Sequence, residues 1–319
     1  MKKTLALVLI LCLAISALAA SSPRLDAMGG IGIAVAGYDM QSYVNPAAVF
    51  FDNNRHIFAL NIETGDQIGQ ASIPYVPQLS ANALFVADMM TLGLDINFNS
   101  QNRRDDGKVD LYQDTALKIN FSVGYKYVSA GIGILAGSTQ QRLNVPMSNI
   151  LDFPMQTLFS QFTRVQNLET IEVSAGLMTK ISGFHIGILL SNILGKDDEG
   201  SVFNWSTLFS QTGIGIYWSR EEYSKRGRAN NFIYSVGLDF DHLFSNERRV
   251  NTGAEIQFRL VRDSSIFARA GFSTPFNDIS QGYVSVGLGG SFRFFEGSLN
   301  VRIPFTDKPT MTLSLMFMF

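Results

Sequence analysis

A cluster of glycines near the start of the chain is the first feature whose residue types could do chemistry. The stretch AMGGIGIAVAG, residues 27–37, contains the pattern G-x-G at Gly30 and Gly32. Glycines at this spacing cradle a dinucleotide when a third glycine follows and when they join a strand to a helix. Val35 stands at the position of the third glycine, and no strand is expected before the stretch. The sequence therefore does not predict a nucleotide site here.

The remaining reactive residues are not spaced for catalysis or for metal binding. The three histidines, His56, His185 and His242, are far apart in sequence, and no Ser–His motif of a barrel lipase accompanies them. Isolated histidines without cysteine partners do not have the spacing of zinc ligands. The acidic runs at 105–106 and 197–199 are interpreted as solvated loop tips rather than as a calcium site. We expect no catalytic residue, no metal and no cofactor.

The first residues predict export. Two lysines precede an apolar run over residues 5–15, and Ala17 and Ala19 are the small residues of a cleavage site. Such a segment is typical of a secretory signal peptide, so we assign residues 1–19 to it, with cleavage near residue 19 or 20. The alternative is an uncleaved anchor, but the run is shorter than the roughly 20 residues that span a membrane. Cys12 is the only cysteine, so the mature chain would contain no disulfide.

The composition disfavours both a nucleic-acid-binding protein and an ordinary soluble domain. Among 319 residues, only 16% are charged and the net charge is −2, while 28 residues are glycine and 25 are phenylalanine. There is no basic stripe or tail that could bind nucleic acid. The part after the signal peptide also lacks a continuous apolar run of about 18 residues, so it predicts no membrane-spanning helix.

From residue 55 onward the dominant period of the sequence is two. In KINFSVGYKY, residues 118–127, and in NTGAEIQFRL, residues 251–260, apolar side chains occupy every second position. Alternation gives each strand one apolar and one polar face. The polar face carries Gly, Ser, Asn and single charges, which fits a confined lumen better than the open surface of a soluble sandwich. The apolar face recurs on nearly every strand and fits contact with lipid.

The pattern predicts an all-β fold, a transmembrane antiparallel β-barrel of about fourteen strands. Counts of 12 or 16 are alternatives. Short connections alternate with long ones, which predicts an even strand number and places both termini in the periplasm. The long connections are expected at 64–78, 100–113, 140–167, 194–207, 241–248, 274–280 and 305–309, and 219–230 is an exception among the short ones. The expected strands are 55–63, 79–87, 90–99, 114–127, 129–139, 168–181, 184–193, 208–218, 231–240, 249–260, 264–273, 281–294, 297–304 and 310–319.

The end of the chain supports the same fold. In MTLSLMFMF, residues 311–319, the apolar residues share one face and the last residue is Phe319. This resembles the C-terminal signature of bacterial outer-membrane barrels, which the barrel assembly machinery recognises. The alternative is an ordinary last strand. The resemblance implies that the assembly machinery is a partner of this strand.

The segment between the signal peptide and the first strand is rich in Gly and Ala, and inside a barrel it can fold back and fill the lumen. RLDAMGGIGIAVAGYDMQSYVNPAAV, residues 24–49, resembles the N-terminal motif of FadL-type outer-membrane proteins, which include long-chain fatty-acid transporters and PorV-like and spirochaete barrels. The matching positions are Met28, Gly29, Gly30, Gly32, Ala34, Asp39, Tyr43, Asn45, Pro46 and Ala47.

The resemblance implies that residues 20–54 are a hatch inside a barrel of residues 55–319. The hatch residues would then include Gly29, Gly30, Gly32, Asn45, Pro46 and Ala47. Pro46 fixes its own backbone and biases Asn45 to an extended form, and Asn45 can cap a short helix that begins there. The alternative is a simple turn that leads into the first strand.

The resemblance also implies a capture site for hydrophobic molecules on the loops that follow the fifth and seventh strands. Both loops are unusually apolar for exposed segments, which is typical of binding sites. Part of the first loop has its apolar residues at helical spacing. The alternative is that the loops pack on each other as a lid. The candidate ligand-binding residues are Leu151, Phe153, Met155, Leu158, Phe159, Phe162, Phe203, Trp205 and Phe209.

The leading hypothesis is therefore a bacterial outer-membrane channel, surrounded by outer-membrane lipid, for a hydrophobic molecule such as a long-chain fatty acid. A barrel that binds a protein partner is the second hypothesis, and a general porin is the third. Charges on the lumen faces are expected to pair partly with one another, because an unpaired charge is costly in a narrow lumen. These are Lys118, Lys126, Glu172, Lys180, Asp239, Glu255, Arg259, Arg269, Arg293 and Arg302.

Overall fold

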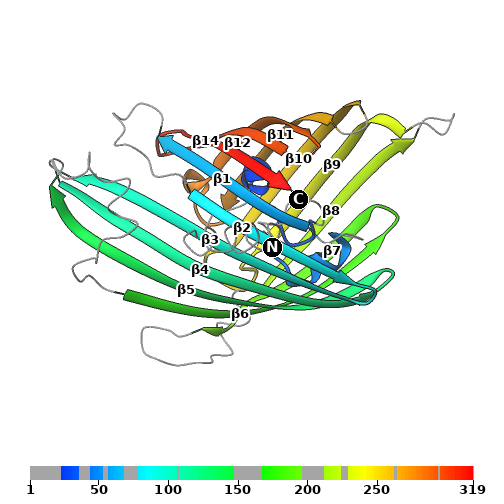
Figure 1. The fold of residues 1–319 in the computed structure, drawn as a ribbon, viewed down its shortest axis with the longest axis horizontal. Coiled ribbons are helices and arrows are strands. Elements are labelled where there is room, and N and C mark those ends of the chain that lie inside the picture. The colour runs from blue at the N-terminus through cyan, green and yellow to red at the C-terminus, as the bar shows by residue number, and fades with distance from the viewer. Residues whose placement is uncertain are drawn as a thin grey trace, which may run out of the picture.

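The chain forms a closed antiparallel β-barrel (Figure 1). A computed structural model describes residues 23–35, 44–52, 57–67, 78–105, 108–146, 167–195, 212–223, 229–261, 264–293 and 295–318. Within these ranges fourteen strands pair in sequence order, and β1 pairs with β14 to close the sheet. The predicted fold class and strand number are confirmed.

The strands differ greatly in length, from 9 residues in β14 to 19 in β5. The fourteen strands are β1 Ile57–Gln67, β2 Gln78–Ala87, β3 Met90–Asp105, β4 Lys108–Tyr125, β5 Val128–Pro146, β6 Asn167–Ile181, β7 Phe184–Gly195, β8 Thr212–Tyr223, β9 Ala229–Asp241, β10 Arg249–Val261, β11 Ser264–Pro275, β12 Tyr283–Phe292, β13 Phe295–Pro304 and β14 Thr310–Met318.

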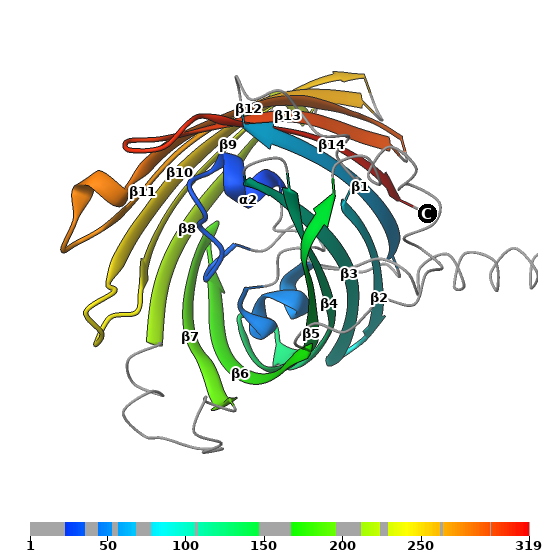
Figure 2. The same ribbon diagram turned by 90° about the vertical axis from the view of Figure 1, so that its left-hand side faces the viewer.

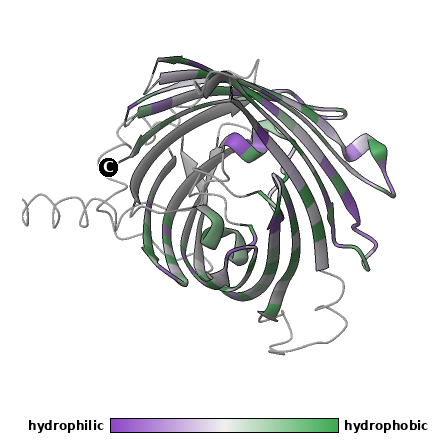
Figure 3. Cartoon of the chain, turned by 90° about the vertical axis from the view of Figure 1, so that its right-hand side faces the viewer, coloured by the Kyte–Doolittle hydropathy of each residue, from purple (hydrophilic) through white to green (hydrophobic). Residues whose placement is uncertain are grey.

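Where their side-chain burial is described, the strands have an apolar outer face and a polar lumen face, as the period of two predicts. On β4, Phe121 and Val123 are exposed while Asn120 and Ser122 are buried. On β12, buried Ser285 lies between exposed Val284 and Val286. Figure 3 shows the resulting bands of hydrophobic residues along the strands. Large apolar side chains that are exposed all round a closed sheet are those that contact lipid.

Several predicted connections are wrong because strands continue into them. The segment 100–113 is almost entirely strand, since β3 ends at Asp105 and pairs there with Lys108 of β4. The strand β5 takes the first part of the predicted loop 140–167, and β8 and β9 reduce the predicted connection 219–230 to residues 224–228. Strand pairing satisfies the backbone hydrogen bonds whatever the side chains are. An apolar outer face is required only where a strand contacts lipid. The strands therefore continue into segments whose sequence does not alternate.

The tight turns lie at one end of the barrel. Lys126 and Tyr127 join β4 to β5, one residue before the predicted turn, and Ser182 and Gly183 join β6 to β7. Lys126, Ser182 and Gly183 have φ values of 45°, 48° and 85°. Positive φ values in two-residue turns match the right-handed twist of the strands that they connect.

Three short helices complete the described structure. Of these, α2 (Pro23–Ala27) and η2 (Pro46–Asp52) lie inside the ring of strands, and η4 (Ile279–Gln281) lies between β11 and β12 (Figure 2). No helix in the described ranges is long and apolar enough to cross a membrane. The segments 23–35 and 44–52, which we call the plug, are almost entirely buried within the barrel. The predicted segment in the lumen is confirmed.

Candidate functional site: the plug and the lumen wall

The first part of the plug is a helix followed by a glycine turn. Helix α2 ends at Ala27, and the turn that follows contains Gly29 and Gly30 with φ values of 74° and 81°. The amide of Gly29 donates to Ser285 Oγ on β12 at 3.1 Å, and Ser285 Oγ donates to the carbonyl of Ala27 at 3.1 Å. Positive φ favours glycine, so two of the predicted hatch glycines are needed for the turn itself.

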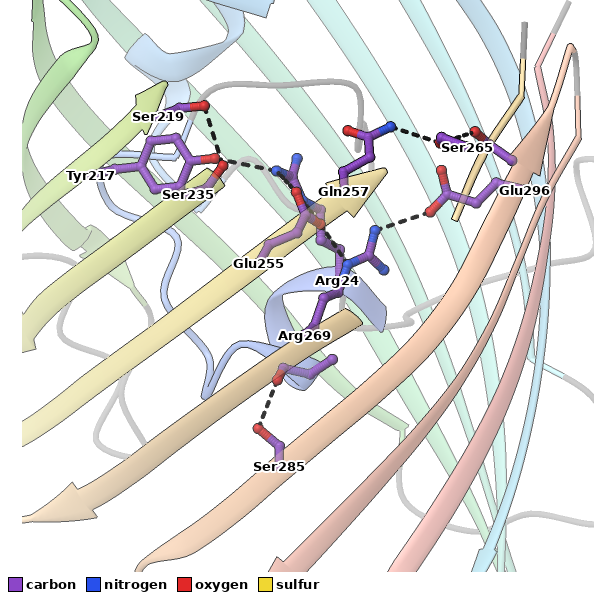
Figure 4. Close-up of polar contacts among 12 residues, drawn as sticks. Arg24, Tyr217, Ser219, Ser235, Glu255, Gln257, Ser265, Arg269, Ser285 and Glu296 are labelled. Atoms are coloured by element: carbon purple, nitrogen blue, oxygen red, sulfur yellow. Dashed lines mark hydrogen bonds and ion pairs between the residues drawn. The ribbon is translucent and has the colours of Figure 1, made fainter. Parts of the chain in front are cut away.

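Helix α2 is attached to the wall by a buried charge network (Figure 4). The guanidinium of Arg24 donates to both carboxylate oxygens of Glu255, at 2.9 and 3.1 Å, and to the Tyr217 hydroxyl at 3.3 Å. Arg269 donates to Glu255 at 2.6 Å and to Glu296 at 3.2 Å. The expectation that lumen charges pair is confirmed for Glu255 and Arg269. Cations and anions therefore alternate along Arg24, Glu255, Arg269 and Glu296.

Asp239 holds the middle of the plug. Its Oδ2 atom accepts hydrogen bonds from the amides of Gly32 and Ile33, at 2.5 and 2.8 Å, and the residue is only 1% exposed. These two consecutive amides lie in residues 31–35, which form no helix or strand with their own hydrogen bonds. A carboxylate is therefore the acceptor for a backbone that would otherwise bury unsatisfied donors.

Asn45 joins the two parts of the plug to each other and to the wall. Its Nδ2 donates to the carbonyl of Ile33 at 2.8 Å, and it lies 3.3 Å from the carbonyls of Leu177 on β6 and Ile188 on β7. Its Oδ1 accepts from the amide of Ala47 at 3.0 Å. Asn45 therefore caps η2 and also ties it to residues 31–35, because its amide both donates and accepts.

Helix η2 packs on the opposite side of the lumen. Pro46 is its first residue, where a missing amide hydrogen costs nothing. The Ser129 hydroxyl on β5 donates to the carbonyl of Ala47 at 2.8 Å. Ala47, Ala48 and Val49 are fully buried, and they form an apolar cluster with Leu84, Met178 and Met316 from three strands. The helix is thus held by apolar packing as well as by hydrogen bonds.

The plug backbone lies in a track of wall glycines that face the lumen. Neighbouring members pair across the strands, as Gly131 with Gly176, Gly187 with Gly215, and Gly253 with both Gly237 and Gly271. A Cβ atom added at any of these positions would overlap an atom of the plug. At Gly131, for example, it would lie 2.5 Å from the carbonyl carbon of Pro46. Only glycine leaves room for the plug on this side of the lumen.

The wall between β2 and β4 is polar rather than glycine-lined. Asn82 Nδ2 donates to Asp95 at 2.7 Å, and Thr91, Asn120 and Ser122 are almost fully buried. The side-chain oxygens of these last three have no hydrogen-bond partner within the described residues. Polar groups in this position usually bind water.

The structure describes the predicted hatch residues but not the predicted ligand-binding residues of the loops. All six predicted hatch residues belong to the plug, and the contacts above bring Gly32, Asn45 and Ala47 to the wall. All nine candidate ligand-binding residues of the loops, Leu151, Phe153, Met155, Leu158, Phe159, Phe162, Phe203, Trp205 and Phe209, lie outside the described residues. His185 is buried beside Phe51 and Tyr217, and His242 is in the turn after β9. No group of acidic residues, His or Cys within the described ranges could hold a metal.

Sequence reasoning missed the partners on the wall. The roles of Arg24, Ser129 and Ser285 follow only from which strand faces which part of the plug. One signal was available for the track, since glycines recur at lumen-facing positions of most strands. The sequence predicts small residues on the lumen faces, but no local pattern shows which of them contact the plug.

These features define a class, a closed antiparallel β-barrel whose lumen contains the plug (Figure 2). No protein-family model matches the chain, and no curated sequence does. Among solved structures, the CymD monoaromatic hydrocarbon channel matches with a TM-score of 0.64 at 13% identity, covering 95% of this chain and 98% of that one.

Two further solved structures have the same fold. A Pseudomonas aeruginosa FadL homologue matches with a TM-score of 0.60 at 9% identity, covering 96% of this chain and 99% of its own. The toluene transporter TodX of P. putida has a TM-score of 0.57 at 12% identity, covering 95% and 98%. This chain therefore has the fold of the FadL-type outer-membrane channels, as its N-terminal motif predicts.

The glycine track gives a direct prediction. Gly253→Ala should displace the plug near Met28, because the new methyl group would overlap the Met28 carbonyl. The barrel should still fold, and its ion conductance in planar bilayers should rise. Gly93→Ala is the matched control, since Gly93 also faces the plug but its nearest plug atom, Val49 Cγ1, would lie at 3.6 Å. Equal conductance in the two variants would refute the track.

The Asp239 contact gives a second prediction. Asp239→Ala removes hydrogen bonds to a charged acceptor that are worth about 1.5–3 kcal/mol each. Hydrogen exchange in peptides that cover Gly32 and Ile33 should accelerate more than about tenfold, since 1.4 kcal/mol corresponds to that factor. Asp241→Ala is the control, because Asp241 accepts from Asn251 of the wall and not from the plug. Unchanged exchange at residues 32–33 would show that Asp239 does not hold the plug.

Proposed function

We propose that this protein is a passive outer-membrane uptake channel for small hydrophobic molecules, with a long-chain fatty acid as the ligand. One observation carries the proposal: a closed barrel with the fold of FadL-type channels has its lumen filled by a segment held through separate contacts. The solved structures with this fold include, by their descriptions, a monoaromatic hydrocarbon channel and a toluene transporter. A general porin would keep an open lumen, which argues against that alternative.

The polar character of the lumen supports an acid rather than a neutral hydrocarbon as the ligand. The described wall carries serines, asparagines and arginines, and its apolar residues mostly contact the plug. A fatty acid has a carboxylate that can exchange hydrogen bonds with such groups and an alkyl chain that cannot. Capture by the apolar loops, passage along the lumen and release past the plug are the proposed steps. Diffusion down a gradient supplies the driving force.

The second hypothesis, a non-transporting barrel that binds a protein partner, has less support. The surfaces expected for such a partner are the external loops and the connection 219–230. Strands β8 and β9 occupy most of it and leave residues 224–228 between them. A fatty acid channel remains the function that we favour.

Uptake by purified protein in proteoliposomes tests the function. Tritiated oleate should enter vesicles that contain the folded barrel faster than empty vesicles, and Phe159→Asp in the first apolar loop should slow entry several-fold. Ile188→Val, a conservative change on the lipid-facing side of β7, is the control. Toluene is the competing ligand in the same assay. If oleate uptake does not exceed that of empty vesicles, the fatty acid channel is refuted. If toluene enters and oleate does not, the ligand is a neutral hydrocarbon and not a fatty acid.

Locking the plug tests whether it moves. A Cβ built at Gly287 would lie 2.7 Å from the Cβ of Ala27, close enough for a disulfide after a small shift. In the Ala27→Cys/Gly287→Cys variant, oxidation should abolish oleate uptake and reduction should restore it. The two single-cysteine variants should be insensitive to both treatments. Full uptake by the oxidised double variant would show that this part of the plug stays in place during transport.

A further inference from the structure

The mouth of the barrel, the end opposite the tight turns, is uneven. Strands β3, β4 and β5 contain 16, 18 and 19 residues, whereas β12, β13 and β14 contain 10, 10 and 9. A tilted strand crosses the membrane with about 9–11 residues. The first three strands therefore continue well beyond the membrane, and the last three only just cross it. Figure 1 shows β3–β5 reaching past the ends of the other strands.

The low side of the mouth ends in three turns that are joined to one another. These are residues 242–248, 276–282 and 305–309, which we call the lip. The amide of Phe276 donates to the carbonyl of Arg248 at 2.8 Å, and the amide of Phe305 donates to the carbonyl of Gly282 at 3.0 Å. Asn277 also donates to the carbonyl of Asn246. The three turns thus form one connected edge and not three independent loops.

The lip exposes large apolar side chains beside charged ones. Phe244, Phe276, Ile279 and Phe305 are 69%, 55%, 67% and 46% exposed. Phe305 follows Leu299 and Ile303 at the alternate, outward-facing positions of β13, and its ring lies 6.2 Å from that of Phe272 on β11. Its apolar surface is therefore continuous with the lipid-facing band of the barrel.

The charged residues of the lip indicate the depth at which it lies. Glu247, Arg248, Asp278, Asp307 and Lys308 are all exposed on the same turns. Charged residues deep in the acyl layer are costly, whereas a segment that is apolar on one side and charged on the other is stable at the boundary between acyl chains and headgroups. Three phenylalanines and an isoleucine exposed together on these turns would be unfavourable in water.

We propose that the lip binds the lipids of the outer leaflet at the boundary between acyl chains and headgroups. Its occupant is lipid, and cover by another part of the chain or by another protein is an outcome that the test below distinguishes. The barrel mouth is then at lipid level beside β9–β14, and it stands above the membrane beside β3–β5. A hydrophobic molecule dissolved in the outer leaflet would meet the mouth on the low side without crossing water.

Site-directed labels test this placement. Single-cysteine variants Phe276→Cys and Ile279→Cys, in a Cys12→Ser background, carry an environment-sensitive fluorophore in vesicles with nitroxide-labelled lipids. Leu288→Cys, 64% exposed on the outer face of β12, is the lipid-exposed reference. The free fluorophore in buffer is the water-exposed reference. Both lip labels should be quenched by shallow nitroxide lipids and several-fold less by aqueous iodide than the free fluorophore.

The opposite pattern would overturn the proposal. Strong iodide quenching with no lipid quenching would place the lip in water, and protection from both quenchers would mean that protein covers it. The result does not depend on the transported molecule, because the label reports lipid contact whether or not uptake is observed. Heat-modified gel mobility confirms that each variant is folded before it is labelled.

Discussion

Backbone hydrogen bonding in the absence of water is the constraint on which this structure depends. Within the membrane every amide and carbonyl must pair inside the protein, and a sheet does this only if it has no edge. The pairing of β1 with β14, from Ala59 with Met318 to Gln67 with Thr310, removes the edge. A closed barrel of fourteen strands is also wide. Side chains just fill the interior of a barrel of about eight strands, so in this wider barrel they leave part of the lumen empty. The plug occupies part of the space that remains.

The composition of the chain follows from this arrangement. A plug that carries its own backbone into the lumen needs room on the wall and partners for its free amides and carbonyls. The glycines from Gly131 to Gly271 supply the room, and Asp239, Ser129 and Ser285 supply the partners. Small and polar residues on the inner face, with apolar residues on the outer face, leave few positions for lysine and glutamate. The low charge content and the abundant glycine are therefore consequences of a filled barrel.

Much of the fold could be predicted from the sequence, because lipid imposes a strict alternation on each strand. All fourteen strands occur where the period of two indicates, and the motif from Met28 to Ala47 indicated a lumen segment. The ends of β3, β4 and β5 could not be predicted, since strands that leave the lipid no longer need an apolar face. The contacts of Arg24 and Asp239 depend on long-range register, with partners more than 200 positions away, and no local pattern encodes them.

The plug contacts differ in kind, and this difference bears on how the plug could be released. Helix α2 is held by the Arg24–Glu255 pair and by an apolar cluster in which its Leu25 packs with Met28 and Tyr217. Breaking a buried ion pair leaves charges that must be hydrated or paired again. Glu255 keeps a partner when Arg24 leaves, because Arg269 also contacts it. Arg24 would then lose the carboxylate of Glu255. Helix η2 is held by an apolar cluster, whose loss exposes surface that no ion can satisfy. Apolar packing holds both parts of the plug, and only the contact of α2 includes an ion pair. An anionic ligand would therefore favour release at α2 rather than at η2, by replacing Glu255 at the Arg24 guanidinium.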